Sequence, residues 1–223
     1  MPFGVDEAGK GPALGSMFAA AVYLEEPDEL PDGIRDSKRL APERREELAA
    51  ILQSDDRVAV GIAEITPARI DAPETDMNSL AVAAHAEAIE GAADDLKRAA
   101  DTTDSLSGLC DACDTDAERF ARRVTDACSL EALSVDARHG ADDDSPLVGA
   151  ASIVAKVERD AHVAALADEY GEIGSGYPGD STTREFLASY VDEHGDLPPF
   201  ARESWSTCED ALAAAEQTGL EQF

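Results

Sequence analysis

The stretch PFGVDEAGKGPALGSMFAAAVYL, residues 2–24, decides how this chain begins to fold. Residues 3–6 carry an apolar alternation and residues 17–24 an apolar run, which predicts two strands, the second buried on both faces. A glycine-rich turn joins them, and it is too short for the helical crossover that neighbouring parallel strands require. We therefore expect the chain to begin with an antiparallel pair.

Apolar periodicity predicts further strands and helices along the rest of the chain. Strands are predicted at 58–65, 106–110 and 130–136, and helices at 43–52, 79–96, 115–127, 147–170, 182–193 and 207–218. The acidic stretch 140–145 is predicted to be a loop. This order of elements indicates an α/β fold with a central mixed β-sheet flanked by helices.

The charge balance of the chain is unusual. It has 48 Asp and Glu against 18 Lys and Arg, a formal net charge of −30, and the acids are spread along the whole chain. This pattern is typical of a globular protein that works in concentrated salt, where charges are screened within about 3 Å at 1 M. The alternative is partial disorder, which the persistent apolar periodicity disfavours. Charge therefore indicates habitat more than function.

The sequence carries no sign of a membrane or secreted protein. There is no run of eighteen apolar residues that would span a bilayer. The N-terminus lacks the basic flank and apolar stretch of a signal peptide. We expect a cytoplasmic protein without membrane association.

Two of the four cysteines, Cys110 and Cys113, form a C-x-x-C pair. A structural zinc site requires a second such pair, or a Cys/His pair at matching spacing, and the sequence has neither. We interpret these cysteines as small buried apolar residues. Structural disulfides are not expected in a protein without a secretion signal.

Two adjacent acids, Asp6 and Glu7, lie where the first strand should enter the core. A carboxylate buried there needs a partner, and a divalent cation would supply one. Adjacent strand residues point to opposite faces, so a shared cation requires the strand to end or twist near Glu7. The alternative is one acid at the edge of the core and one solvated acid.

Further acids lie at the ends of other predicted elements: Asp111, Asp114, Asp142, Asp143 and Asp144. For Asp114 the alternative is a helix N-cap, and for Asp143 and Asp144 it is a favourable interaction with a helix N-terminus. Carboxylates are the usual protein ligands of Mg²⁺ and Mn²⁺. Acids that converge beside a nucleic-acid backbone would form a two-metal phosphodiesterase, with ions about 3.5–4 Å apart.

Five separated segments of the chain follow one known order. They are GVDEAGKGPALGSM at 4–17, DSKRL at 36–40, CDACDTDAERFARRV at 110–124, ARHGADDDSPLVGAASIVAKVERD at 137–160 and EYGEIGSGYPGDSTTREFL at 169–187. Together they resemble the type 2 ribonucleases H, specifically ribonuclease HII of the archaeal kind. The scattered acidity then resembles a salt-loving version. The resemblance implies a ribonuclease H-like catalytic domain over 1–180 and a C-terminal helical extension, packed on it, over 181–223.

The resemblance also implies four catalytic acids. The DEAGKG segment matches the family's first two, Asp6 and Glu7. The third is the Asp directly after a strand, which is Asp111 rather than Asp114. The fourth is the first Asp of the run before a P-x-x-x-A-A-S helix, which is Asp142. By the same resemblance Asp160 is structural and bonded near Arg159, while His139 matches a histidine near the active site.

Substrate contacts are implied in the same way. The family's Gly-Arg-Gly turn reads the ribose 2′-hydroxyl largely through backbone groups, and here it is Gly9, Lys10 and Gly11. Lysine keeps the charge of arginine but loses its planar fork. Tyr177 matches a tyrosine that stacks on the sugar at the RNA–DNA junction; its alternative is packing on Pro178. Two more residues match a segment near the substrate backbone, Ser37 and Lys38.

The implied activity is endonucleolytic cleavage of the RNA strand of RNA–DNA hybrids and at ribonucleotides embedded in duplex DNA. Two Mg²⁺ or Mn²⁺ ions would act together, bridged by Asp6, with Glu7 and Asp111 on one and Asp142 on the other. The products would carry 3′-hydroxyl and 5′-phosphate ends, and only RNA positions would be cut because the site reads a 2′-hydroxyl. We expect a monomer, and the sequence does not establish a sliding-clamp partner.

The acidity conflicts with the basic face that nucleic-acid binders normally show. Candidates for a residual basic strip are Lys10, Arg35, Lys38, Arg39, Arg44, Arg45, Lys156, Arg184 and Arg202. Two rival interpretations remain. One is another two-metal nuclease, such as a junction resolvase, which has no reason to keep a ribose-reading turn. The other is an acidic, salt-adapted binding protein that holds cations without cleaving anything.

Overall fold

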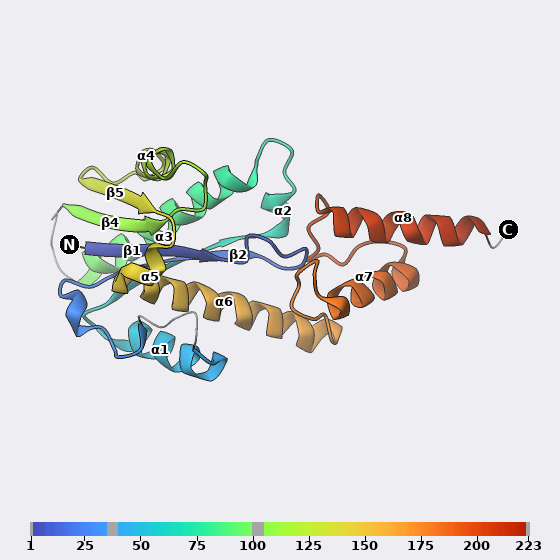
Figure 1. Cartoon of the computed structure of the whole chain (residues 1–223), viewed down its shortest axis with the longest axis horizontal. Coiled ribbons are helices and arrows are strands. Elements are labelled where there is room, and N and C mark those ends of the chain that lie inside the picture. The colour runs from blue at the N-terminus through green and yellow to red at the C-terminus, as the bar shows by residue number, and fades with distance from the viewer. Residues whose placement is uncertain (1, 35–39, 100–104, 222–223) are drawn as a thin grey trace. The chain divides into compact units, whose positions relative to one another are not determined.

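The computed structural model describes residues 2–34, 40–99 and 105–221. The chain forms two compact units, shown in Figure 1, and each is described by itself. We call residues 1–8, 18–64 and 76–158 the sheet unit. We call residues 9–17, 65–75 and 159–223 the helical unit. The predicted boundary at residue 180 stays a prediction.

The sheet has five strands in the order β3-β2-β1-β4-β5. The strands are β1 (Pro2–Ala8), β2 (Met17–Tyr23), β3 (Ala59–Ile65), β4 (Leu106–Asp111) and β5 (Leu133–Arg138). The first two pair antiparallel, whereas β1 with β4 and β4 with β5 pair parallel. Every residue of β2 is buried. The predicted mixed sheet and the doubly buried second strand are therefore confirmed.

Helices cover both faces of this sheet. The longer helices of the sheet unit are α1 (Pro42–Ser54), α3 (Met77–Ala99), α4 (Ala117–Ala127) and the first part of α6 (Pro146–Tyr170). Val22 of β2 belongs to the core cluster with α1 and α6, while its neighbour Tyr23 donates to the carbonyl oxygen of Ile89 in α3, at 3.5 Å. Because neighbouring strand residues point to opposite faces, α1 and α6 cover one face and α3 the other, as Figure 1 shows.

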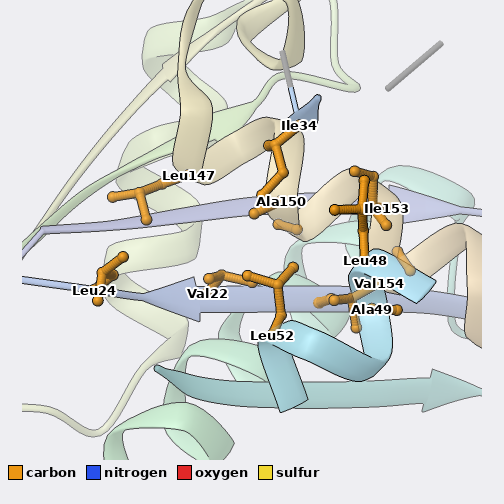
Figure 2. Packing of buried hydrophobic residues seen from close by; sticks show 13 residues of the cluster. Val22, Leu24, Ile34, Leu48, Ala49, Leu52, Leu147, Ala150, Ile153 and Val154 are labelled. Atoms are coloured by element: carbon orange, nitrogen blue, oxygen red, sulfur yellow. The ribbon is translucent and has the colours of Figure 1, made fainter. Parts of the chain in front are cut away.

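The core between α1, α6 and the sheet is built from aliphatic side chains. Figure 2 shows Leu48 and Leu52 of α1 and Ile153 of α6 gathered over Val22. The contact of α6 with β1 is closer still, because a Cβ added to Gly4 would lie 2.2 Å from the backbone of Leu147. Only glycine permits this approach. It brings the N-terminal half of α6 against the strand that carries the paired acids.

One local prediction was wrong. The stretch 140–145 is not a loop throughout, because it contains the four-residue helix α5 (Ala141–Asp144). Gly140 reverses the chain at φ 66°, and the Ser145 amide closes the single turn on the Ala141 carbonyl at 2.8 Å. A helix this short has no apolar period to detect. The alternative considered for Asp114 does not hold either, because the N-cap of α4 is Asp116, whose side chain accepts from the Arg119 amide.

The helical unit has its own core. It holds α2 (Pro67–Ile70), α7 (Ser181–His194), α8 (Ser206–Glu221) and the C-terminal part of α6. Buried residues from the glycine-rich turn and the later helices form one cluster: Ala13, Leu14, Ile173, Leu187, Phe200, Ala201 and Cys208. Among the described residues, no helix is long and apolar enough to cross a membrane.

Candidate active site

Asp6 and Glu7 lie where β1 is still paired with β2 but no longer with β4. Along β2 the pairing continues, with Asp6 opposite Ala20 and Glu7 opposite Ala19. Along β4 it stops at Val5, opposite Cys110. The strand ends at Ala8, next to Glu7, and its pairing with β4 is already released at Asp6. Asp6 is only 6% exposed, and the Glu7 side chain is 12% exposed.

The two neighbouring acids keep the alternation of a strand. Asp6 is hydrogen-bonded by the hydroxyl of Ser152 on α6. Glu7 instead contacts His85 on α3, with 2.9 Å between Oε2 and Nε2. The two carboxylates thus have partners on opposite faces of the sheet, although each still feels the other's charge.

Asp111 and Asp142 are held together by the backbone. Asp111 ends β4, and its Oδ1 accepts from the Ala141 amide of α5 at 2.9 Å. This bond fixes the start of the short helix whose second residue is Asp142, which is buried at 5% exposure. The next residue, Asp143, is exposed. The structure therefore distinguishes Asp142 from its acidic neighbour.

Electrostatics link the four acids into one cluster. The pKa of Asp6 is raised to about 8, mainly by burial and then by the charges on Glu7 and Asp111. The pKa of Asp111 is also raised, mainly by burial and then by the charges of Asp142 and Glu7. Like charges this close disfavour ionisation unless a cation compensates them. The sheet unit thus places all four predicted acids near enough for their charges to interact.

The oxygen atoms of these four acids are suitable ligands for a divalent metal ion. All four ligands are hard carboxylate oxygens, which suit Mg²⁺ and Mn²⁺. A bound cation would favour the ionised form of Asp6, which burial and its neighbours oppose. Lys156 donates to Ser152 at 2.6 Å, and Ser152 bonds Asp6, so the Lys156 ammonium acts on this carboxylate through a hydroxyl.

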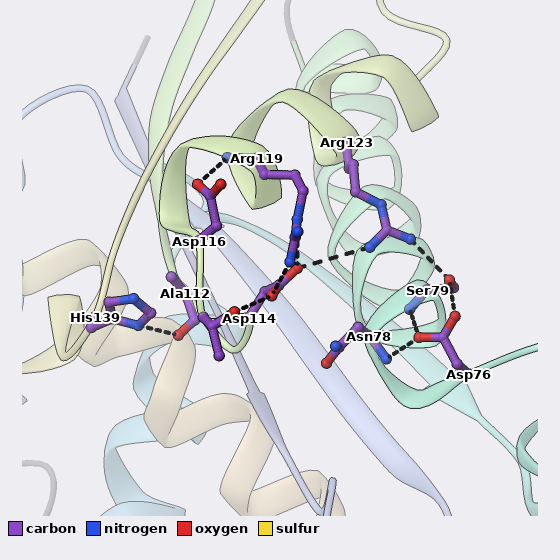
Figure 3. Close-up of polar contacts among 10 residues, drawn as sticks. Asp76, Asn78, Ser79, Ala112, Asp114, Asp116, Arg119, Arg123 and His139 are labelled. Carbon is purple, nitrogen blue, oxygen red and sulfur yellow. Dashed lines mark hydrogen bonds and ion pairs between the residues drawn. The ribbon is translucent and has the colours of Figure 1, made fainter.

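Asp114 serves a different purpose. Figure 3 shows its carboxylate facing Arg119, at 2.6 Å, and Arg123, at 4.0 Å. Hydrogen bonds and charge from Arg119 hold the pKa of Asp114 below its usual range. Because α4 satisfies this buried acid with arginines, it is a structural ion pair. In the same view His139, an exposed residue, has its Nδ1 at 3.0 Å from the Ala112 carbonyl.

The turn with Gly9, Lys10 and Gly11 belongs to the helical unit and is fixed through its carbonyl groups. The guanidinium of Arg202 donates to the carbonyls of Gly9, Lys10 and Gly15 at 2.6, 3.0 and 2.9 Å. The indole of Trp205 donates to Gly11 at 3.2 Å. Gly9 has φ 87°, a conformation that favours glycine.

Arg202 therefore corrects one expectation. It was a candidate for the basic strip, but it is fully buried and bonded to backbone carbonyls. Burial lowers its pKa to about 10. Sequence alone gave no reason to expect a buried arginine here, because its three acceptors lie far from it along the chain.

Tyr177 lies beside this turn. It is 40% exposed, and a Cβ added to Gly11 would lie 3.6 Å from its ring. Arg159 lies over the ring at 5.0 Å from its centroid and also pairs with Asp160 at 3.0 Å, as predicted for Asp160. The amide of Ala13 donates to Gly176 at 2.8 Å, which ties the tyrosine loop to the turn.

The remaining predicted contacts lie outside the described residues or bond to the protein itself. Ser37 and Lys38 lie outside the described residues, as do Arg35 and Arg39. Several other basic candidates bond to the protein itself: Arg44 to Glu47, Arg45 to the Leu40 carbonyl, Lys156 to Ser152 and Arg184 to the Pro178 carbonyl. The structure thus shows little free basic surface among the described candidates.

Sequence reasoning missed His85 and Cys113 as neighbours of Glu7. One ligand atom from each of these three residues lies within 4.8 Å of the other two. Cys110 is buried, as interpreted, but Cys113 is only partly buried. A lone histidine in the middle of a predicted helix gave no indication of this contact.

Comparisons with known proteins point to one family. The sequence profile of a family described as Ribonuclease HII matches residues 3–208. A Ribonuclease HII from Haloarcula marismortui is 61% identical over 224 residues, covering 100% of both chains. A crystal structure of ribonuclease H2 from Pyrococcus horikoshii matches with a TM-score of 0.85 and 33% identity, over 97% of this chain and 99% of that one. The structure of a PCNA:RNase HII complex from Archaeoglobus fulgidus matches with a TM-score of 0.79 and 33% identity, over 95% and 96%.

Proposed function

The chain belongs to the ribonuclease HII family, and we propose that Asp6, Glu7, Asp111 and Asp142 form its nuclease centre. It is a metal-dependent endoribonuclease that cleaves the RNA strand of RNA–DNA hybrids and ribonucleotides embedded in duplex DNA. The observation that carries the assignment of residues is that Asp6 is buried and that Asp111 is hydrogen-bonded to the amide next to buried Asp142.

These carboxylates would hold two Mg²⁺ or Mn²⁺ ions, which when bound supply Lewis-acid activation of water and neutralise charge at the scissile phosphate. Asp6 would supply the central ligand of this set, because the charges of both Glu7 and Asp111 reach it. Ser152 holds the Asp6 carboxylate through its hydroxyl, and Lys156 holds that hydroxyl. The Ala141 amide orients Asp111 and sets α5, so that Asp142 is buried beside it.

Selection of a ribonucleotide is assigned to the helical unit. Arg202 and Trp205 hold the carbonyls of the glycine turn, so the backbone path of Gly9 to Gly11 is fixed before substrate binds. A fixed turn recognises a 2′-hydroxyl without further ordering. Tyr177, exposed beside Gly11, would stack on the sugar at the junction.

The cleavage assay uses two labelled duplexes, one all DNA and one with a single ribonucleotide, incubated in molar KCl with Mg²⁺ or Mn²⁺. We expect a cut on the 5′ side of the ribonucleotide, leaving a 3′-hydroxyl, and no cut in the control duplex. Cleavage of both would indicate a less selective nuclease. Cleavage of neither by the folded protein would indicate an acidic cation-binding protein.

Partners beyond the nucleic acid stay predictions. We expect a monomer, to be measured by light scattering in molar KCl. The relative from Archaeoglobus fulgidus was crystallised with PCNA, but the last two residues of this chain, Gln222 and Phe223, lie outside the described residues. Co-elution with the sliding clamp, compared between the whole chain and a chain shortened before Gln217, tests that partner directly.

A further inference from the structure

Glu7 has two neighbours that a magnesium site does not need. Its Oε2 lies 2.9 Å from Nε2 of His85, and Sγ of Cys113 completes a group of three ligand atoms within 4.8 Å of one another. The three residues come from β1, from α3 and from the segment after β4. His85 is fully buried, whereas the other two are partly exposed. An ion from solvent therefore has access to one side of the group.

The chemistry of these ligands differs from that of the four carboxylates. Mg²⁺ takes oxygen ligands and does not favour a thiolate. A thiolate, an imidazole and a carboxylate are instead the three ligand types that Zn²⁺ prefers. In tetrahedral zinc sites, with bonds of about 2.0–2.3 Å, ligand atoms are separated by roughly 3.3–3.8 Å. The observed group therefore needs movements of about 1 Å to close on an ion.

We propose that Glu7, His85 and Cys113 form a site for Zn²⁺ that is distinct in chemistry from the nuclease centre and withdraws Glu7 from it. On binding, the Cys113 thiol releases its proton to solvent, neutral His85 supplies a ring nitrogen, and water fills the fourth position. Nδ1 of His85 has no hydrogen-bond partner among the described residues. Zinc-bound histidines usually donate a hydrogen bond from their other nitrogen, and this bond strengthens metal binding. Because Nδ1 of His85 lacks it, the site binds zinc reversibly and is inhibitory rather than structural.

Occupancy has a direct consequence for catalysis. Glu7 faces α3 when it contacts His85, while Asp6 bonds to α6. Zinc would hold Glu7 on the α3 side and remove it from the carboxylate cluster. Zn²⁺ at low concentration should therefore inhibit cleavage supported by Mg²⁺. This inhibitory arm rests on the proposed function, whereas zinc binding itself does not.

Binding is measured without nucleic acid. Metal-free protein is titrated with Cd²⁺, a thiolate-seeking probe for the zinc site, and the cadmium–thiolate absorption is followed. We expect one equivalent to bind in the wild type and in Cys128→Ser, whose parent thiol is half-buried 3.9 Å from the Ala86 carbonyl. Cys113→Ser should weaken binding roughly 10- to 100-fold, at least as much as loss of a residue that only supports a ligand. Equal absorption in Cys113→Ser, or none in the folded wild type, would overturn the site.

A second measurement needs no variant. One equivalent of Zn²⁺ should slow alkylation of Cys113 in the wild type and leave Cys128 unaffected, as mapped by mass spectrometry. Unchanged alkylation of Cys113 contradicts the proposal.

The cleavage assay separates zinc binding from its inhibitory role. Inhibition by Zn²⁺ that Cys113→Ser relieves, with its Mg²⁺ activity kept, supports the regulatory role. Cadmium binding without any cleavage would leave the site intact and refute the proposed function instead.

Discussion

Replacing Arg202 by methionine should make the helical unit easier to unfold, because this one side chain fixes the glycine turn. The buried guanidinium donates to three carbonyls, at 2.6, 2.9 and 3.0 Å. Each hydrogen bond from a charged group contributes roughly 1.5–3 kcal/mol. Against this, burial lowers the pKa of Arg202 to about 10, which corresponds to a cost of about 3 kcal/mol for the charge. The free energy of unfolding should fall by roughly 2–6 kcal/mol in the variant.

The assay is urea unfolding in molar KCl, followed by the fluorescence of Trp205, the single tryptophan of the chain. Arg184→Met is the matched control, because this exposed arginine donates to only one carbonyl, that of Pro178. It should change the free energy of unfolding by no more than about 0.5 kcal/mol. The loss of unfolding free energy in Arg202→Lys should lie between those in Arg202→Met and Arg184→Met, since an ammonium keeps the charge but lacks the planar fork. The reasoning is refuted if Arg202→Met and Arg184→Met unfold at the same urea concentration.

Three further predictions concern charge and packing. Without divalent ions, the free energy of unfolding should decrease as pH rises from about 4 to about 8, by up to about 1.4 kcal/mol per pH unit, because folded Asp6 keeps a proton that the unfolded chain has lost. Thermal melts of the wild type and Asp6→Asn in molar KCl check this, and identical pH profiles would contradict it. Hybrid affinity should depend only weakly on KCl, because few basic side chains among the described residues are available to phosphates. Fluorescence anisotropy that shows a steep fall in affinity toward molar salt would contradict this. Gly4→Ala should lower the urea midpoint because its Cβ would meet Leu147 at 2.2 Å, whereas Gly179→Ala, which meets nothing within 4 Å, should not.

Much of the fold was predictable because its elements have local causes. The apolar run at 17–24 is long enough to indicate a strand buried on both faces, and β2 is such a strand. Pro42 and Pro146 mark the first residues of α1 and α6, where a missing amide costs no hydrogen bond. For the acids, the resemblance placed Asp111 at the end of β4, and the structure brings it beside Asp142.

What could not be predicted depends on contacts that are distant in sequence. Arg202 bonds a turn more than 180 residues away, so its sequence neighbourhood indicates only a surface cation. His85 meets Glu7 across 78 residues, and a helical histidine gives no sign of this. The four-residue α5 is set by one bond from Ala141 to Asp111, which no periodicity reveals. Local pattern therefore predicted the elements but not the side chains that connect them.

The central claim is that four carboxylates of the sheet unit, two of them buried, perform the reaction. It is tested most directly by cleavage of the single-ribonucleotide duplex with Asp142→Asn and Asp143→Asn, since the two residues are adjacent on α5 but only Asp142 is buried. We expect Asp142→Asn to lower the cleavage rate by at least roughly 100-fold, as for loss of a metal ligand, and Asp143→Asn to keep it near that of the wild type. Near wild-type cleavage by Asp142→Asn, or an equal loss in both variants, would contradict the assignment of the fourth acid.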